Sequence, residues 1–450
     1  MKTQFKQSQR QLEIIYQARR AKVLRQIKGG VAIFCASSEK ISDRDQSYPF
    51  QQEADFFYLT GLNEPKAVLL LVNTDRPKSI LFIRDKDPDN ERWNGEILGV
   101  VRAKKIFKLD QVLDIKELQP KLQEFLVGAK TLHYALGGNE SFDKIVLSLM
   151  QNKVGPKANF PNILSDARLI TSKMRWVKDK YEIGCLRQAS AITACGLVGT
   201  IPVIKDFASE KDCAAFLESV YYSLGADKIA FPTIVASGSN ATVLHHRPAS
   251  KSMSAKDLVL IDTGASVGGY SGDITRTVPV SGKFTKEQRA VYEVVLTALE
   301  VGIKNAKPGR TLNDIHNAVC VSLTEGLLKL GVFRKGTVSK LVKDKAYKFF
   351  YMHRTGHPLG LNTHDIEPVY ALSDAEQVRF NQARDLPLVA GNVFTIEPGL
   401  YFDPKDSTVP KKYRGIGIRI EEDVLITRSG CEVLSRAVPR SVEGIEGLFG

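Results

Sequence analysis

The sequence lacks several features that would each define a class of protein. Its 450 residues contain no apolar run close to the ~20 residues of a membrane-spanning helix. The first 23 residues are polar and hold no apolar segment of the kind found in secretory signals. None of the six cysteines forms a C-x-x-C pair, and their spacing indicates no disulfide framework, as is typical of thiols in a reducing compartment. We therefore expect a cytoplasmic protein without a membrane partner.

Basic residues are in excess but are not concentrated in any segment. Lysine and arginine number 63 against 50 acidic residues, which gives a net charge of +13. No block of five or six basic residues occurs, so the excess predicts a solvated basic surface and no nucleic-acid partner. The apolar fraction of 43% is that of an ordinary globular protein and is enough for a sizeable core.

The chain is too long for one ordinary domain, and its pattern of apolar and polar residues changes near residue 172. In residues 1–172, short apolar, β-prone runs at 31–35, 67–72 and 79–83 alternate with polar, helix-like stretches such as 111–123, which predicts an α/β domain. Residues 173–450 carry helical stripes at 178–196 and 209–224, then strands, and repeat that order with helices that begin at Thr285 and Thr311. This order predicts an α+β domain of two helix-helix-sheet halves.

The segment 257–279, DLVLIDTGASVGGYSGDITRTVP, predicts a β-hairpin that carries two acidic residues. Asp262 and Asp273 lie at equal distances from the expected centre of the turn, between Val267 and Gly268. A regular antiparallel register would place the two carboxylates directly opposite each other, where like charges repel. Buried carboxylates in that position share a proton or a cation. The alternative is a pair of capping or salt-bridged aspartates at a turn.

Five of the seven histidines fall in polar or glycine-rich turns: His245, His246, His353, His357 and His364. The other two, His133 and His316, have ordinary surface or core surroundings. His353 and His357 are four residues apart, which on a helix would be a zinc-ligand spacing. Gly356, Pro358 and Gly360 argue against a helix there, so an extended or looped segment is predicted.

Two further glutamates stand in strand-like sequences. Glu397 ends the apolar run 392–397 and is followed by Pro-Gly, where a strand stops. In 415–421 the strand period of two places Gly417, Arg419 and Glu421 on one face, as in a strand that lines a cavity. The alternatives are an ordinary strand-end residue for Glu397 and a salt bridge to Arg419 for Glu421.

Four carboxylates and one imidazole form the candidate metal-ligand set: Asp262, Asp273, His357, Glu397 and Glu421. An oxygen-rich set with one nitrogen suits manganese, iron, cobalt or zinc rather than a thiolate-bound ion. Four carboxylates balance the charge of two divalent ions, and two such ions about 3.5–4 Å apart hold a hydroxide nucleophile at neutral pH. The set therefore predicts a two-metal hydrolytic site.

These motifs resemble those of aminopeptidase P, the Xaa-Pro aminopeptidases of the pita-bread fold, which are closely related to prolidase. The resemblance runs over nearly the whole chain and is densest in LVLIDTGASVGGYSGDITRTVPVSGKFT, GHPLGLNTHD, FTIEPGLY and YRGIGIRIEEDVLIT. It implies an α/β creatinase-like domain at 1–172 and an α+β pita-bread catalytic domain at 173–450. It also implies a dinuclear centre, usually of manganese, in a metallopeptidase that removes the first residue of peptides with proline second.

The resemblance further implies roles for residues around that centre. A hydroxide between the two metals would attack the first carbonyl, and Glu397 would be both a ligand and the proton shuttle to the leaving nitrogen. His245 would stabilise the tetrahedral intermediate, with His246 as the weaker candidate. His353 and His364 would contact the substrate around the scissile bond and the proline ring.

Four more residues gain roles in the same way. Arg419 and Tyr401 would form a supporting pair that orients the carboxylates. Asp45 and Trp93 match positions at which the N-terminal domain of a neighbouring subunit reaches the active site. The resemblance thus implies a homodimer or homotetramer that acts on peptide substrates.

Three positions depart from the family's usual pattern. Arg354 stands where glycine is usual, Pro358 where an aromatic is common and Asn362 where aspartate is common. The added cation predicts a preference shifted towards acidic or longer peptides. Prolidase, which cleaves only dipeptides, is the nearest rival, and a metal-free pita-bread binding protein is a second. Methionine aminopeptidase is disfavoured because it does not need the N-terminal domain.

Overall fold

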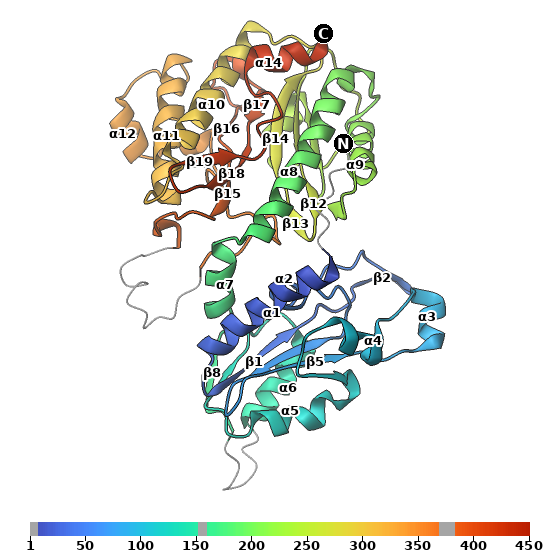
Figure 1. Cartoon of the computed structure of the whole chain (residues 1–450). Helices are drawn as coiled ribbons and strands as arrows, with labels where there is room; N and C mark the ends of the chain where they lie inside the picture. Colours follow the sequence, from blue (N-terminus) through green and yellow to red (C-terminus); the bar gives the residue numbers. More distant parts are fainter. Residues whose placement is uncertain (1–7, 152–159, 369–382) are drawn as a thin grey trace. The chain divides into compact units, whose positions relative to one another are not determined.

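The computed structural model describes residues 8–151, 160–368 and 383–450, which form two compact units (Figure 1). The N-terminal unit ends at Lys173, and the C-terminal unit runs from Met174 to Gly450. The boundary expected at residue 172 lies beside this division.

The N-terminal unit is built on a six-stranded mixed sheet with the order β6-β5-β4-β1-β7-β8. Its strands are β1 (Gly30–Cys35), β4 (Val68–Val72), β5 (Lys78–Ile83), β6 (Gln111–Asp114), β7 (Thr131–His133) and β8 (Ile163–Ser165). β4 pairs antiparallel with β1 and β5, whereas the other pairs are parallel. β4 is buried along its whole length, which accounts for its unbroken apolar sequence VLLLV. The strands expected at 31–35, 67–72 and 79–83 are confirmed.

Helices cover both faces of this sheet, with α1 and α2 on one face and α5 and α6 on the other (Figure 1). The elements are α1 (Gln9–Gln26), α2 (Ala54–Thr60), α3 (Pro88–Asn94), α4 (Gly99–Ile106), α5 (Leu118–Leu126), α6 (Glu140–Gln151) and a small hairpin of β2 (Ile41–Asp43) and β3 (Gln46–Ser47). Helix α7 (Arg168–Trp176) continues along the chain past the end of this unit. The helix expected at 111–123 is only partly correct, because its first four residues form edge strand β6. A polar edge strand with one buried side chain, Val112, is hard to distinguish from a helix by pattern.

The C-terminal unit has two halves, each with a pair of helices followed by strands. The helix pairs are α8 (Lys180–Thr200) with α9 (Glu210–Ser223), and α10 (Lys286–Asn305) with α11 (Leu312–Lys329). Figure 1 shows the two pairs on opposite sides of the strands. Thr285 and Thr311 begin α10 and α11 through reciprocal capping boxes, as expected from the sequence. The order of elements confirms the predicted helix-helix-sheet halves.

The strands of the C-terminal unit form small antiparallel sheets. The first half has β10-β11-β14 and β13-β12-β9, and the second half has β15-β18-β19 and β16-β17. The elements are β9 (Lys228–Ile229), β10 (Ile234–Ser237), β11 (Leu258–Thr263), β12 (Ala265–Val267), β13 (Tyr270–Ser271), β14 (Ile274–Pro279), α12 (Val338–Lys343), β15 (Val393–Ile396), β16 (Gly399–Tyr401), β17 (Gly417–Arg419), β18 (Glu422–Ile426), β19 (Cys431–Val433) and α14 (Val442–Glu446). Every residue of β11, β14, β15 and β18 is buried, so these strands form the centre of the unit.

One helical segment is apolar enough to be compared with a membrane span. Lys180–Asp206, which is α8 with the 3₁₀ turn that follows it, has a mean hydropathy of 1.2 over its most apolar window. Within the fold, 56% of that window is buried, and Leu197 and Ile201 belong to the apolar core of the first half. The core helix of a globular protein passes the same test, so this segment is weak evidence for a membrane span.

Candidate metal centre

The first half presents its two acidic residues on the β11–β14 hairpin. Asp262 pairs with Thr275, so the prediction that Asp262 and Asp273 lie directly opposite each other is wrong. The reason is the turn, in which Gly268 and Gly269 adopt positive φ angles of 59° and 83° and form the two-residue connection themselves. The centre of the turn therefore lies between Gly268 and Gly269, one residue later than expected. This register places Asp273 diagonally from Asp262 on the same face.

The second half contributes His357, Glu397 and Glu421 from three segments. Glu397 directly follows β15, and Glu421 lies between β17 and β18. His357 lies in a segment without helix, as expected, and its carbonyl accepts the N–H of Thr395 in β15 (2.9 Å). The N–H of Glu421 donates to the carbonyl of Thr275 (3.1 Å). A backbone hydrogen bond thus joins the two halves at one of the ligands, Glu421.

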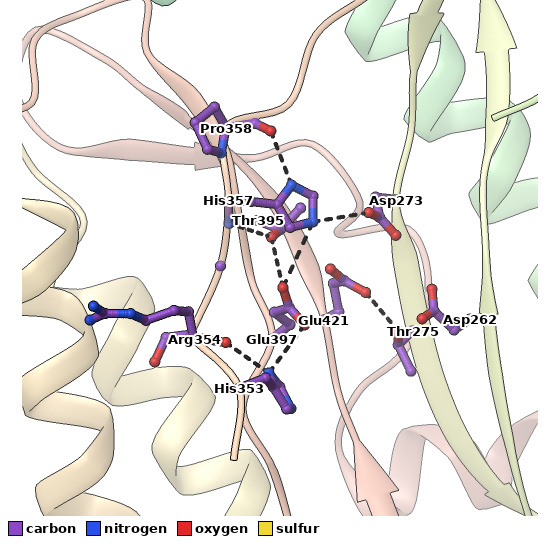
Figure 2. Close-up of polar contacts among 12 residues, drawn as sticks. Asp262, Asp273, Thr275, His353, Arg354, His357, Pro358, Thr395, Glu397 and Glu421 are labelled. Carbon is purple, nitrogen blue, oxygen red and sulfur yellow. Dashed lines mark hydrogen bonds and ion pairs between the residues drawn. The ribbon is translucent and has the colours of Figure 1, made fainter. Parts of the chain in front are cut away.

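The candidate ligands of the two halves converge (Figure 2). One ligand atom from each of Asp273, His357 and Glu421 lies within 4.8 Å of the other two, an arrangement that could hold a metal ion. His357 Nε2 is 3.4 Å from Asp273 Oδ2 and 3.7 Å from Glu397 Oε1. Asp262 is also buried, whereas the Glu397 carboxylate is 17% exposed and gives the cluster a side open to solvent.

Burial and mutual repulsion raise the pKa values of three carboxyl groups in the cluster, those of Asp273, Glu421 and Glu397. Burial raises the pKa of Asp273, and the negative charges of Glu421 and Asp262 raise it further. Burial and then the charge of Glu397 raise the pKa of Glu421. The pKa of Glu397 rises to about 8, because burial outweighs the lowering effect of Arg419. Carboxyl groups this close resist ionising together unless a cation joins them.

His357 offers a neutral ring nitrogen to the same space. Its Nδ1 donates to the carbonyl of Pro358 (3.0 Å), which leaves Nε2 as the acceptor that faces Asp273 and Glu397. Burial, followed by the charge of His364, lowers the pKa of His357 to about 3. The ring is therefore neutral at neutral pH, and its free nitrogen is available to a cation.

A chain of hydrogen-bonded side chains lies beside the ligands. Arg419 makes a buried ion pair with Asp262 and donates a second N–H to Tyr401 Oη (3.0 Å). The Nδ1 of His353 donates to the carbonyl of Arg354 (2.8 Å), so its Nε2 accepts the hydroxyl of Tyr401 (2.9 Å). The expected Arg419–Tyr401 contact is present, and it extends to His353.

The donor set fits divalent cations. Asp262 gives one oxygen to Arg419, and the other, Oδ1, is buried without a hydrogen-bond partner among residues 8–151, 160–368 and 383–450. Glu421 accepts the hydroxyl of Thr275 (2.6 Å), and Arg419 pairs with Asp262 instead of forming the salt bridge considered for Glu421. Buried oxygens that lack donors, beside a neutral imidazole, are the environment that manganese, zinc and similar ions require.

Three other expected site residues lie around this cluster. His353 Nδ1 is 3.6 Å from Glu397 Oε2, and the His364 ring centroid is 4.0 Å from that of His357. His245 is exposed on the loop after the 3₁₀ turn Gly238–Thr242, and its charge contributes to the lowered pKa values of both His353 and His364, after burial. His353 and His364 therefore lie beside the ligands, and His245 lies close enough to interact electrostatically with both rings.

Asp45 and Trp93 lie in the N-terminal unit. Trp93 is on α3 and is 87% exposed, and Asp45 is exposed in the turn between β2 and β3. An indole that is almost fully exposed has no packing role within its own unit, so it is available to another surface.

The three departures from the family pattern have structural contacts. Arg354 donates to Asn313 of α11 (3.3 Å), and Figure 2 shows its guanidinium directed away from the ligands. The carbonyl of Pro358 accepts the Nδ1–H of His357, and the carbonyl of Asn362 accepts a backbone N–H in the same loop (3.1 Å). This geometry gives no support to a substrate-binding role for Arg354.

Sequence reasoning missed Asp423, a fully buried residue behind Asp273. Its Oδ2 accepts the backbone N–H of Asp273 (3.2 Å) and the hydroxyl of Ser190 on α8. Burial raises the pKa of Asp423 to about 7. Its spacing of two residues from Glu421, in the acidic run EED, is the signal that could have identified it.

Glu210, at the start of α9, was also missed, and it organises the loop that carries His245. Its Oε1 accepts from the N–H of Ser237 (2.7 Å) and from Asn240 (2.8 Å), and its Oε2 faces His246 Nε2 (2.7 Å) and the N–H of Ala249 (2.8 Å). Burial alone would raise its pKa, but these donors hold the pKa of Glu210 below its usual value. Glu210 therefore fixes both ends of the loop 238–249.

We expect Glu210→Gln to destabilise the fold at neutral pH by about 1–3 kcal/mol, because one amide cannot accept from all of these donors. A lowered folded-state pKa gives stability that is present above the usual value of 4.5 and is lost as the pH falls through the folded value. The difference in the free energy of unfolding between wild type and variant should therefore shrink below about pH 4.5. Denaturant unfolding at several pH values measures it, and a deficit that grew on acidification would contradict this sign.

Two family models match the chain. They are Metallopeptidase family M24, over residues 184–428, and Aminopeptidase P, N-terminal domain, over residues 16–134. The Xaa-Pro aminopeptidase of Escherichia coli (strain K12) is 37% identical over 440 residues, covering 96% of this chain and 97% of that protein. That of Haemophilus influenzae is 36% identical over 436 residues, covering 96% of each.

Solved structures agree with these matches. Aminopeptidase P from E. coli with the inhibitor Pro-Leu has a TM-score of 0.90 at 36% identity, covering 99% of this chain and 98% of that chain. A zinc-substituted form in complex with product has a TM-score of 0.91 at 35% identity, with the same coverage. The chain therefore belongs to metallopeptidase family M24. Within that class it groups with the aminopeptidase P proteins, as its motifs indicated, and the expected pita-bread fold is confirmed.

Proposed function

We propose that this chain is an Xaa-Pro aminopeptidase, a hydrolase that removes the first residue of peptides with proline in second position. The observation that carries the proposal is the buried convergence of Asp273, His357 and Glu421, with Asp262 and Glu397 beside them. The proposal is supported by relatives of that name that cover both units of the chain. Prolidase, the nearest rival, is not favoured by these relatives.

Asp262, Asp273, His357, Glu397 and Glu421 would hold two divalent cations, and we propose manganese as the native metal, with zinc, cobalt and iron as alternatives. Such a pair supplies Lewis acidity and lowers the pKa of water at the site. The ligand atoms do not by themselves choose among these metals, and one related structure carries zinc.

We propose Glu397 as the group that moves the proton that hydrolysis requires. Its Oε1 lies 3.7 Å from His357 Nε2 and its Oε2 3.6 Å from His353 Nδ1, so it stands between the ligands and the open side. A carboxylate in that position can take a proton from water and return it to a leaving group. We propose that it takes a proton from the attacking water and passes it to the prolyl nitrogen.

His245, His353 and His364 border the space where the scissile bond would lie. Proline has no backbone N–H, so recognition depends on the shape of its ring and on donors placed near its nitrogen and carbonyl. We propose that His353 and His364 contact the residues on either side of the bond and that His245 stabilises the tetrahedral oxyanion. Arg419 and Tyr401 act on His353 and Asp262 by holding their orientation.

We further propose that the chain assembles as a homodimer or homotetramer in the cytoplasm. The support is the exposure of Trp93 and Asp45, which match positions that serve a neighbouring subunit in related enzymes. Light scattering of the active protein measures this. A monomeric mass together with full activity would remove the role assigned to these two residues.

The proposed function is tested by manganese-dependent release of the first residue from an Xaa-Pro-Xaa tripeptide. We expect turnover that disappears with a chelator and returns with manganese. The same tripeptide with alanine in second position is the control for proline specificity. Cleavage of Xaa-Pro dipeptides without tripeptide turnover would instead identify a prolidase. Failure to bind any divalent metal would indicate a metal-free binding protein.

A further inference from the structure

A polar interface joins α11 to the segment that carries the catalytic histidines. On the α11 side, Asn313, His316 and Cys320 follow one another at intervals of three and four residues, which places them on one helix face. On the other side stand Tyr351, Arg354 and Thr355. We call these six residues the α11 seam. His316 has an ordinary core pattern in the sequence, so the seam has no signal there.

The hydrogen bonds of the seam have one direction in which the Tyr351 and Thr355 hydroxyls and the His316 ring N–H all donate. The Tyr351 hydroxyl is 2.7 Å from Thr355 Oγ1, which is 2.8 Å from His316 Nδ1, and His316 Nε2 is 3.5 Å from Cys320 Sγ. If Tyr351 donates to Thr355 and Thr355 donates to His316 Nδ1, the ring proton lies on Nε2 and faces the sulfur. In the reverse direction, the hydroxyl hydrogen of Tyr351 has no acceptor among the residues that the structure describes.

The protonation state of His316 agrees with this direction. Burial, with the nearby cations Arg354, Arg384 and Lys348, lowers the pKa of His316 to about 4. The ring is therefore neutral at neutral pH and has one accepting nitrogen. Tyr351 is fully buried, and Thr355 and Cys320 are 3% and 1% exposed, so water does not compete for these bonds.

The seam touches two residues of the proposed machinery directly. The carbonyl of Thr355 accepts the backbone N–H of Glu397 (2.7 Å). The ring of Tyr351 packs edge-on against that of His353, with centroids 4.7 Å apart. A shift of Thr355 or Tyr351 would therefore displace the proton-carrying carboxylate and the imidazole that borders the substrate space.

Arg354 strengthens the same connection. Its guanidinium donates to Asn313, whose own amide donates to Asp385 (2.6 Å), so the position where the family usually has glycine is tied to the start of α11. This contact explains the added cation without a contact to substrate.

We infer that His316 is a positioning residue for the reaction: through the Thr355 hydroxyl it fixes Glu397 and His353, an inference that rests on the proposed function. The α11 seam thus links a core helix outside the ligand set to the residues that move the proton. The ring of His316 does not touch substrate in this scheme.

Thr355→Val tests this inference, because it keeps the shape of threonine but removes the hydroxyl that joins Tyr351 to His316. We expect kcat to fall by about tenfold or more, since small displacements of catalytic groups have effects of that size. KM and metal content should stay within about twofold, because no proposed ligand or substrate contact is changed. Thr355→Ser restores the hydroxyl and should restore kcat.

A matched control is Thr324→Val on the same helix. Thr324 is also buried, but among the residues that the structure describes its hydroxyl bonds only to the carbonyl of Cys320 (2.7 Å). If Thr324→Val lowers kcat as much as Thr355→Val, or if Thr355→Val keeps wild-type kcat, the positioning role is refuted. Loss of thermal stability in both variants, with loss of kcat in Thr355→Val alone, supports it.

A second measurement depends neither on activity nor on a folded variant at position 355. In the ¹⁵N spectrum of histidine-labelled protein, the His316 signals, assigned by their loss in His316→Gln, should show the tautomer protonated on Nε2. Protonation on Nδ1 would overturn the inference. If the wild-type enzyme shows no turnover of Xaa-Pro peptides, the proposed function fails, while this tautomer still decides the arrangement of the seam.

Discussion

Asp273→Asn is expected to abolish peptidase activity and, at the same time, to stabilise the metal-free fold. Asparagine has the shape of aspartate but removes one of the negative charges that crowd around His357 and Glu421. Several kcal/mol of metal-derived transition-state stabilisation correspond to a loss on the order of 10³-fold in kcat/KM. Without metal, the folded state is relieved of a buried carboxyl group whose ionisation is opposed by burial and by the neighbouring carboxylates, which raise its pKa.

The two expected effects of Asp273→Asn run in opposite directions: activity falls, whereas the stability of the metal-free protein rises. General damage to the fold would lower both, so the experiment distinguishes it from loss of a ligand. Bound metal, measured on the purified protein, should fall, and the melting temperature in chelator should rise. A gain of about 1 kcal/mol corresponds to about 2–4 °C for a domain of this size. Asp227→Asn is the matched control, because Asp227 accepts the N–H of Gly268 in the same hairpin but is not a proposed ligand. A variant that retained more than a tenth of the activity would contradict the ligand role of Asp273.

Glu397→Gln is expected to lower kcat by about 10²- to 10⁴-fold with a much smaller change in KM. Glutamine keeps an oxygen that can face a cation, but it cannot take up and return a proton. The two carboxylate oxygens lie 3.7 Å from His357 Nε2 and 3.6 Å from His353 Nδ1, between the ligands and the side open to solvent, which suits proton transfer. The loss should therefore appear in the chemical step.

Metal content separates the two roles assigned to Glu397. We expect the variant to hold most of its metal, since four other proposed ligands remain. Glu432→Gln is the control, because Glu432 lies on β19 of the same sheet and pairs with Arg187 at the surface. If activity and bound metal fell in the same proportion, Glu397 would be a ligand alone and the proton would have to move through another group.

The sequence predicted the residues of the candidate site better than their arrangement. Types and spacing were enough to select Asp262, Asp273, His357, Glu397 and Glu421, because hard cations restrict which side chains can bind them. The register of the hairpin was misjudged by one position at its centre, since the pattern did not show that both glycines take positive φ. A shift of one residue in the position of the turn changes which side chains lie opposite each other on the two strands.

Contacts between distant segments were not accessible from the sequence. Arg419 and Glu421 are neighbours on one strand face, which suggested a salt bridge, but Arg419 reaches across to Asp262 from the other half. Asp423 and Glu210 act through bonds to segments far away in the chain, and no local pattern distinguishes them from surface carboxylates. Helix starts were read correctly because a capping box is complete within four residues.

The turn at Gly268 and Gly269 has a consequence for how much the segment between the two aspartates can vary. Ten residues separate Asp262 from Asp273. Gly268 and Gly269 alone connect the paired residues Val267 and Tyr270, so the turn has no spare residue. Adding or removing a single residue there would swing one carboxylate to the opposite side of its strand, even if every proposed ligand were kept. The length of this connection is therefore constrained as tightly as the identity of the acids at its two ends.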